Sequence, residues 1–443
     1  MRKELIKAGA SLLTGRLTGL IANFIFIALL ARYLSVENLG HYFLLANLVI
    51  VLGILARFGM EKAVLKLYAD AINSSIPTLN ITKAVTLILS LSALITSLLF
   101  YLFKASIFNT IFGVPELVQY FFYVILWFVL TALQLILAEV LRARKCFFKA
   151  SIIKGTLSNI LNLIAALILL SVASSSNLDL VLNIVICNLL LSLVVATIWL
   201  NNWTRRKSNM SGSVSEVEWR PQVRSLLLFS TPLLLNQLTL FITSQSDIWI
   251  VTAFYGTEST ALYGASVKIA LLTGLALAIA NGVLPPYISE YRIKGDTRGL
   301  ERLLKAVSTI VAIPALIFII LLMIFPSWAL SLIYGEPYSK SYPILQILLL
   351  GQLINVLVGS CGFVLVMFGY SKALMIYSLI GGGLAVSLAL TFAYFDMGLN
   401  YIAWSFTIGV GLQQILMLYL CKKLTNISTS INIFKTLKYV REF

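Results

Sequence analysis

Apolar runs of about 20 residues follow one another from end to end of this 443-residue chain. A membrane-spanning helix needs a run of this length, because each residue advances it by about 1.5 Å and the hydrocarbon core is about 30 Å thick. Hydrophobic residues make up 60% of the sequence, charged residues make up 11%, and the mean hydropathy is +0.96, far from the composition of soluble domains. We therefore expect an all-α, polytopic membrane protein with about 12 transmembrane helices. The runs centre near residues 21, 50, 93, 129, 162, 189, 240, 276, 315, 356, 382 and 409.

The net charge of +16 is explained by membrane topology, because cytoplasmic loops collect Lys and Arg. If the N-terminus is cytoplasmic, only Arg32, Lys104 and Lys340 lie in predicted outer segments, and only Arg16 and Lys268 lie within spans. All other basic residues then lie on the inner side. We expect a multi-pass protein of the plasma (inner) membrane with both termini in the cytoplasm, and no nucleic acid partner.

A polar segment near the middle of the chain, residues 203–224, is the longest predicted inner link. Its composition is typical of a linker between structural units. We predict an N-terminal six-helix lobe over residues 1–222 and a C-terminal six-helix lobe over residues 223–443.

An internal repeat supports this division. The sequence IFGVP, which begins at Ile111, recurs as IYGEP, which begins at Ile333. A second match begins at Lys83 and recurs from Lys305, so both matches have the same offset along the chain. Six helices per lobe is an even number, so the two lobes enter the membrane in the same direction. This predicts a parallel, MATE-like repeat with a binding site between the lobes.

The first span carries a basic residue, Arg16, about two turns from its start. A cation at this depth is unfavourable in lipid, so we expect it to face a cavity, with Gly19 and Asn23 on the same helical face. The alternative is that Arg16 extends toward the inner headgroups. Arg57 lies at the inner end of the second span, about as far from the outer turn as Arg16. It either helps to bind a phosphate or pairs with Glu61 four residues later.

The seventh span carries a polar stripe in an otherwise apolar helix. Asn236, Thr239, Thr243 and Asp247 are spaced by three, four and four residues, so they share one face and are expected to line a cavity. In the eighth span, Lys268 lies about as far from the outer turn as Asp247 does. We predict an ion pair between these two side chains, which either stabilises the helices or also gates the outer side.

Motifs for phosphate-loop and zinc-protease chemistry, GxxxxGK[ST] and HExxH, do not occur, and the single histidine is His41. We expect no cofactor, no metal site and no enzymatic activity, a solvated structural His41, a structural Glu139 paired with Arg142, and four free thiols.

Four segments together resemble the Wzx-like polysaccharide and O-antigen flippases of the MOP (MATE-like) exporter superfamily. The resemblance implies a transporter that moves polyprenyl-diphosphate-linked oligosaccharide from the inner to the outer membrane face by alternating access. It also implies cations in the central cavity, for which Arg16 and Lys268 are the positions that fit. The segments are LSVENLGHY at 34–42, TPL at 231–233, LPPYIS at 284–289 and IYG at 333–335.

The leading hypothesis is therefore a flippase of lipid-linked oligosaccharides. A diphosphate is bound by cations, and sugars are bound by amide and hydroxyl groups. Besides this substrate, the expected partners are membrane lipid, a polysaccharide polymerase and a chain-length regulator. A MATE-type cation-coupled drug exporter is the alternative, expected to hold an unpaired carboxylate, for which only Asp247 qualifies. A membrane glycosyltransferase is the third hypothesis, and the short outer loops argue against it. The predicted substrate-binding residues are Arg16, Asn23, Asn236, Thr239, Thr243, Asp247 and Lys268.

Overall fold

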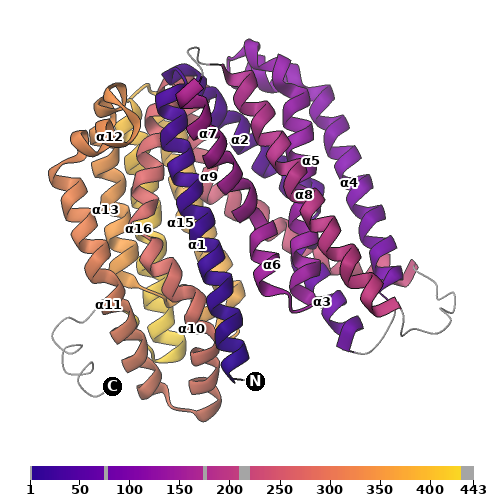
Figure 1. The fold of residues 1–443 in the computed structure, drawn as a ribbon. Helices are drawn as coiled ribbons and strands as arrows, with labels where there is room; N and C mark the ends of the chain where they lie inside the picture. The colour runs from indigo at the N-terminus through magenta and orange to yellow at the C-terminus, as the bar shows by residue number, and fades with distance from the viewer. Residues whose placement is uncertain (1, 74–77, 173–176, 209–219, 431–443) are drawn as a thin grey trace. The chain divides into compact units, whose positions relative to one another are not determined.

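The structure, a computed structural model, describes residues 2–73, 78–172, 177–208 and 220–430. These residues are almost entirely helical, and they contain no strand (Figure 1). Eleven helical stretches within the described ranges are long and apolar enough to cross a membrane. The predicted all-α, polytopic membrane fold is confirmed.

The chain forms two compact units, unit 1 (Met1–Thr239) and unit 2 (Leu240–Phe443). The predicted lobe boundary, between residues 222 and 223, stays a prediction.

Unit 1 is built from helices that pack against one another in pairs, with α1 beside α7 and α2 beside α5. Ser35 begins α2, because its hydroxyl accepts a hydrogen bond from the Asn38 backbone N–H at 3.2 Å. The first part of α9 (Arg220–Leu272) also belongs to this unit. The preceding elements are α1 (Arg2–Tyr33), α2 (Val36–Arg57), α3 (Met60–Asn73), α4 (Leu79–Ala105), η1 (Ser106–Ile111), η2 (Pro115–Tyr120), α5 (Phe121–Ala143), α6 (Phe147–Ser151), η3 (Ile152–Thr156), α7 (Leu157–Val172) and α8 (Leu178–Ser208).

Helix α9 reverses direction at Gly256, where the backbone adopts φ 79° and ψ −178°. The hydroxyls of Thr252 and Thr260 are 2.9 Å apart. In a straight helix these residues would be separated by about 12 Å along the axis. The single stretch Leu226–Leu272 is therefore an antiparallel pair of helices, which accounts for the seventh span and the start of the eighth.

Unit 2 repeats the order of elements in unit 1. The two halves of α9, the first of which begins in unit 1, correspond to α1 and α2. The following elements keep the order of those in unit 1, except that η3 has no counterpart among the described residues of unit 2. The remaining elements are α10 (Leu275–Lys294), α11 (Thr297–Ile324), α12 (Pro326–Tyr334), η4 (Glu336–Ser341), α13 (Tyr342–Val358), α14 (Cys361–Met367), α15 (Ser371–Tyr394) and α16 (Leu399–Thr425).

The repeated sequence motif has the same local structure in both units. Gly113 has φ +65° and precedes the 3₁₀ helix η2, and Gly335 has φ +110° and precedes the 3₁₀ helix η4. Lys83 lies in α4 and Lys305 in α11, the long helices that come before these turns. The constant offset of the sequence repeat therefore links equivalent positions in the two element orders.

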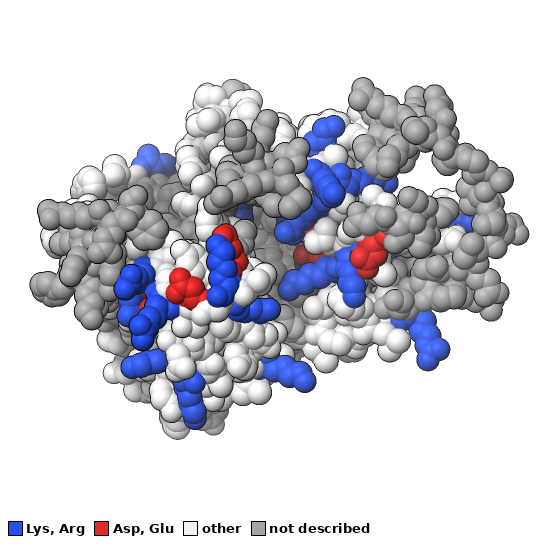
Figure 2. Space-filling view, turned by 90° about the horizontal axis from the view of Figure 1, so that it is seen from below, with Lys and Arg blue, Asp and Glu red and all other residues white. Residues whose placement is uncertain are grey.

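Figure 2 shows one face of the molecule, on which blue Lys and Arg side chains predominate over red Asp and Glu. Several helices carry basic residues in their last turns, where cations also interact favourably with the helix dipole. Examples are Arg142 of α5, Arg292 and Lys294 of α10, and Lys422 and Lys423 of α16.

Candidate functional site

Arg16 lies beside the packed face of α1. Gly15 and Gly19 form that face: the Gly15 carbonyl accepts a hydrogen bond from Thr156 Oγ1 at 2.8 Å, and the Gly19 carbonyl accepts one from Asn159 Nδ2 at 3.0 Å. Glycine allows this close approach, because a Cβ on Gly19 would lie 3.1 Å from Thr156 Oγ1 and 3.2 Å from Thr156 Cα. Gly19 therefore lies in a packed interface, about 60° around the helix from Arg16.

The Arg16 side chain is exposed. It is turned about 60–100° around the helix from the two glycines, and among the described residues no acidic side chain forms an ion pair with it. Asn23, two turns further along α1, is half-buried. These two members of the predicted site lie in unit 1.

The polar stripe of α9 passes from unit 1 into unit 2. Asn236 and Thr239 are half-buried at the end of unit 1. Thr243 is half-buried in unit 2, where its hydroxyl donates to the Leu240 carbonyl at 3.2 Å and its side chain occupies the space that Gly382 leaves open on α15. Thr243 thus helps α9 to pack against α15.

Asp247 and Lys268 interact electrostatically within unit 2 but do not form the contact ion pair that we predicted. Asp247 is 6% exposed, and its Oδ1 accepts a hydrogen bond from the Ile248 N–H at 2.9 Å. The opposite charges attract each other, but among the described residues the ion pairs with an N–O separation within 4.0 Å do not include this pair.

The reason for this difference is the position of the turn. The chain reverses at Gly256, so Asp247 lies nine residues before the reversal and Lys268 lies twelve after it. Three residues correspond to about 4.5 Å along a helix axis. The two side chains are therefore displaced by almost one turn.

A fully buried tyrosine, Tyr263, lies near the same carboxylate. It belongs to an apolar cluster with Ile248, Val251 and Ile344. Within the described part of the chain its hydroxyl has no hydrogen-bond partner. Asp247 is thus a charged group at the edge of an apolar core.

Unit 2 also contains a cluster of amide side chains that our sequence reasoning missed. Gln414 Nε2 of α16 donates to Asn355 Oδ1 of α13 at 3.0 Å, and Asn355 Nδ2 donates to Gln352 Oε1 at 3.3 Å. All three side chains are half-buried. A Cβ on Gly274 would lie 3.6 Å from Gln352 Oε1, so the amide cluster lies against the break between α9 and α10. The spacing of Gln352 and Asn355 within an apolar span is the signal that was available.

Two other ionic groups have structural partners within unit 1. Arg57 Nε lies 2.8 Å from Glu61 Oε1, which confirms the ion-pair alternative for Arg57. Glu139 is 3% exposed and lies 3.5 Å from Arg142 Nη1, as predicted, but its closer partner is Lys154 Nζ at 2.6 Å. Lys154 comes from η3, which sequence spacing could not place beside α5.

The expected solvated position of His41 is wrong. The side chain is 6% exposed, and its Nε2 lies 3.5 Å from Glu116 Oε1. The sequence places Glu116 in another outer segment, so the contact depends on how η2 packs against α2.

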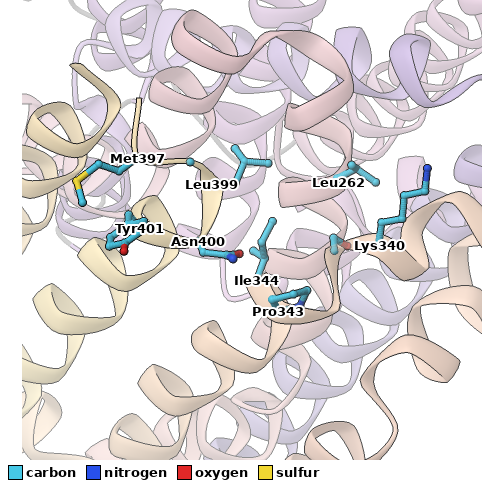
Figure 3. Close-up of a pocket in the computed structure, with 10 residues that line it drawn as sticks. Leu262, Lys340, Pro343, Ile344, Met397, Leu399, Asn400 and Tyr401 are labelled. Atoms are coloured by element: carbon cyan, nitrogen blue, oxygen red, sulfur yellow. The ribbon is translucent and has the colours of Figure 1, made fainter. Parts of the chain in front are cut away.

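A small pocket of about 280 Å³ lies in unit 2 beside η4 and the start of α16 (Figure 3). Asn400 directs its amide into the pocket, whereas the Lys340 ammonium points away from it. Apolar side chains such as Leu262, Ile344 and Leu399 form much of the wall. Its volume is below the usual range of about 300–1,000 Å³ for small-molecule sites, so it does not accommodate a lipid-linked glycan.

The fold is that of known membrane transporters. A MATE family transporter of the MOP superfamily, in an inward-facing conformation, has a TM-score of 0.72 and 15% identity over 93% of this chain and 94% of that chain. The lipid II flippase MurJ, in an inward closed conformation, has a TM-score of 0.72 and 18% identity over 99% of this chain and 93% of that chain. A MOP superfamily transporter from Pyrococcus furiosus, described as having a binding pocket of reverse polarity, has a TM-score of 0.62 and 14% identity over 95% of this chain and 96% of that chain.

No curated protein sequence matches the chain significantly. The sequence does match the profile of a family described as "Polysaccharide biosynthesis protein" over residues 5–292. This match covers more than half of the chain, including the polar stripe of α9 and Lys268. It confirms the resemblance noted from the sequence motifs, and the chain belongs to the polysaccharide biosynthesis protein family.

Proposed function

We propose that this protein is a flippase that moves polyprenyl-diphosphate-linked oligosaccharide repeat units from the inner to the outer face of the plasma membrane. The observation that carries the proposal is membership of the polysaccharide biosynthesis family by a chain built from membrane-spanning helices. A fold shared with a lipid II flippase supports it. Alternating access between inward-open and outward-open states moves the substrate.

The diphosphate is bound by cations. Arg16 suits this role because its guanidinium presents a planar fork of donors that matches two phosphate oxygens, and no acidic partner among the described residues neutralises it. Lys268 supplies a second cation, and its attraction to Asp247 is the interaction that a bound diphosphate weakens. Substrate binding thereby loosens the contact between the two halves of α9.

The sugars are bound by amides and hydroxyls. Asn23, Asn236, Thr239 and Thr243 are the members of the predicted set, all half-buried and so accessible from one side. The amide cluster of Gln352, Asn355 and Gln414 extends the set, because each amide offers a donor and an acceptor to a sugar hydroxyl. A helix break beside such a cluster is typical of transporter binding sites.

The protein acts without covalent catalysis, and its termini lie in the cytoplasm. The basic last turns of α5, α10 and α16 support this orientation, because Lys and Arg concentrate on the cytoplasmic side of membrane proteins. A polysaccharide polymerase and a chain-length regulator are the proposed partners on the outer side, where the flipped repeat units become substrates for chain growth.

A MATE-type drug exporter is the second candidate. It is favoured by one observation: Asp247 is buried and, among the described ion pairs, has no contact partner, as expected for a carboxylate that couples transport to a cation. A flippase and a drug exporter differ in their cargo, so the cargo decides between them.

The experiment is a deletion strain of the source organism, complemented with wild type, Arg16→Ala or empty vector. We expect polyprenyl-linked repeat units to accumulate on the inner membrane face in the deletion strain and with Arg16→Ala, and to disappear with wild type. Drug susceptibility is measured in parallel. A deletion strain that exports glycan normally but becomes sensitive to cationic drugs would instead identify an exporter.

A further inference from the structure

Three potential metal ligands meet at one end of unit 1. Glu37 and His41 are one turn apart at the start of α2, and Glu116 lies in η2, just before α5. One ligand atom from each side chain lies within 4.8 Å of the others. The group contains one imidazole and two carboxylates, and both kinds of side chain bind zinc in proteins.

The imidazole provides a second, independent observation. His41 is 6% exposed, and within the described residues its Nε2 is buried without a hydrogen-bond partner. The atom points toward Glu116, whose Oε1 lies 3.5 Å away. Buried polar atoms normally have a partner, so the site lacks one group that can bind to Nε2.

We propose that Glu37, His41 and Glu116 bind a divalent transition-metal ion, with Zn²⁺ the best match. Ligands of a tetrahedral zinc ion, bound at about 2.0 Å, are ~3.3 Å apart. The 3.5 Å between His41 Nε2 and Glu116 Oε1 is close to this distance. Glu37 is exposed and the Glu116 side chain is 50% exposed, so both carboxylates can rotate toward the ion.

Unit 2 lacks the site. The positions that correspond by the offset of the sequence repeat are Ser259, Tyr263 and Tyr338, which offer hydroxyls in place of the imidazole and carboxylates. Tyr263 and Tyr338 are almost fully buried. The metal therefore ties α2 to η2 in unit 1 alone and fixes the turn that begins at Gly113.

The test uses the full-length protein in detergent with an affinity tag free of histidine, cysteine and carboxylate clusters. Isothermal titration with Zn²⁺ measures stoichiometry and affinity, and Co²⁺ supplies a visible absorption spectrum that reports tetrahedral coordination. We expect one tight site in wild type, with a raised thermal unfolding temperature when the metal is bound. Transport activity is not a readout, so the result is independent of the proposed function.

The variants are Glu116→Gln, Glu37→Gln and His41→Gln. Loss of a ligand is expected to weaken Zn²⁺ binding by more than about tenfold, the lower limit for changes in the surrounding shell of a metal site, and to abolish the Co²⁺ spectrum. The matched control is Glu258→Gln, an exposed acid in unit 2 that lies outside the cluster, which should bind as wild type does.

Two results would overturn the proposal. One is a wild-type protein that takes up no stoichiometric Zn²⁺ or gives no tetrahedral Co²⁺ spectrum. The other is Zn²⁺ binding that persists unchanged in all three variants. If His41→Gln does not fold, Glu37→Gln still decides the question, because Glu37 is exposed and its substitution leaves the buried core unchanged.

Discussion

The two units share an order of elements but use their polar groups within the membrane differently. In unit 1, Asn188 Nδ2 donates to Asn162 Oδ1 at 2.8 Å, and Gln134 Nε2 donates to Ser192 Oγ at 3.0 Å, with all four side chains buried. In unit 2 the amide cluster is half-buried. Unit 1 thus uses these amides to hold its own helices together, whereas the amide cluster of unit 2 remains partly exposed.

The helix breaks in the two units differ in the same way. In unit 1, Phe58 and Gly59 have positive φ and separate α2 from α3, between the partners of the Arg57–Glu61 ion pair. In unit 2 the break falls at Gly274, beyond the reversal at Gly256, and adjoins the amide cluster. The first break is sealed by backbone packing, and the second leaves polar side chains nearby.

Gly59→Ala should have the largest effect, the loss of folded protein. A Cβ at this position would lie 2.5 Å from the Leu234 N and 2.6 Å from the Ser230 carbonyl oxygen. Both are backbone atoms that cannot move aside. Size-exclusion chromatography of detergent extracts measures the folded fraction.

Two control variants separate the effect of steric overlap from the effect of a strained backbone conformation. Gly113→Ala has a similar φ, +65°, but nothing within 4 Å of the new Cβ, so it should show only the cost of a left-handed conformation, about 1–2 kcal/mol. Gly274→Ala should fold, because its nearest neighbour would be at 3.5 Å. Folded Gly59→Ala at wild-type yield would remove the proposed difference between the two breaks.

Arg16→Ala should lose nearly all glycan export at unchanged abundance. Arg16→Lys keeps the charge but lacks the planar fork, so partial export is expected. Export is measured in the deletion strain at matched protein levels. Arg32→Ala, an exposed cation near the other end of α1, is the control and should export normally. Full export by Arg16→Ala would exclude a role for unit 1 in binding the diphosphate through this residue.

Single substitutions of amide residues should affect stability in unit 1 and export in unit 2. Asn188→Ala in unit 1 leaves the buried Asn162 side chain without its partner, which costs about 1–3 kcal/mol and should lower abundance and thermal stability. Gln414→Ala in unit 2 should leave abundance near wild type and reduce export several-fold, because we propose that Gln414 binds sugar. Stability and export are measured for both variants. Equal losses of stability would contradict the assignment of the amide cluster to substrate.

The coupling energies in double-mutant cycles should be smaller than the effects of the single substitutions above. Glu139 and Lys154, at 2.6 Å, should show a stability coupling of about 1 kcal/mol. Asp247→Asn and Lys268→Gln should couple more weakly in stability but clearly in export, and the charge swap Asp247→Lys plus Lys268→Asp should restore part of the export that either single change loses. Additive effects in both assays would show that Asp247 and Lys268 do not interact.

The sequence contained most of the architecture and part of the site. Run length and the offset repeat predicted the spans and the order of elements, because lipid imposes both a minimum helix length and internal hydrogen bonding. Side-chain contacts were harder to predict. Three contacts that the sequence did not predict join separate helices: Glu116 with His41, Lys154 with Glu139, and Gln414 with Asn355. Sequence spacing could not predict them, because it gives no information on how each helix is rotated about its axis. The depth of Asp247 and Lys268 was misjudged because the position of the reversal within the outer turn decides their alignment.

The reversal in α9 also bears on how the protein is made. During synthesis, the first half of α9 emerges carrying Asp247 and is followed within one hairpin by Lys268. A single charge at a helix centre opposes transfer into the bilayer by about 2.5–3.5 kcal/mol, but in a hairpin that enters as one body the attraction between the two opposite charges offsets part of this cost. We infer that the ribosome must complete both arms before the seventh span leaves the translocon. Nascent chains truncated between Gly256 and Lys268 should therefore show reduced insertion in a glycosylation-reporter assay, and insertion should recover when the truncated chain carries Asp247→Asn.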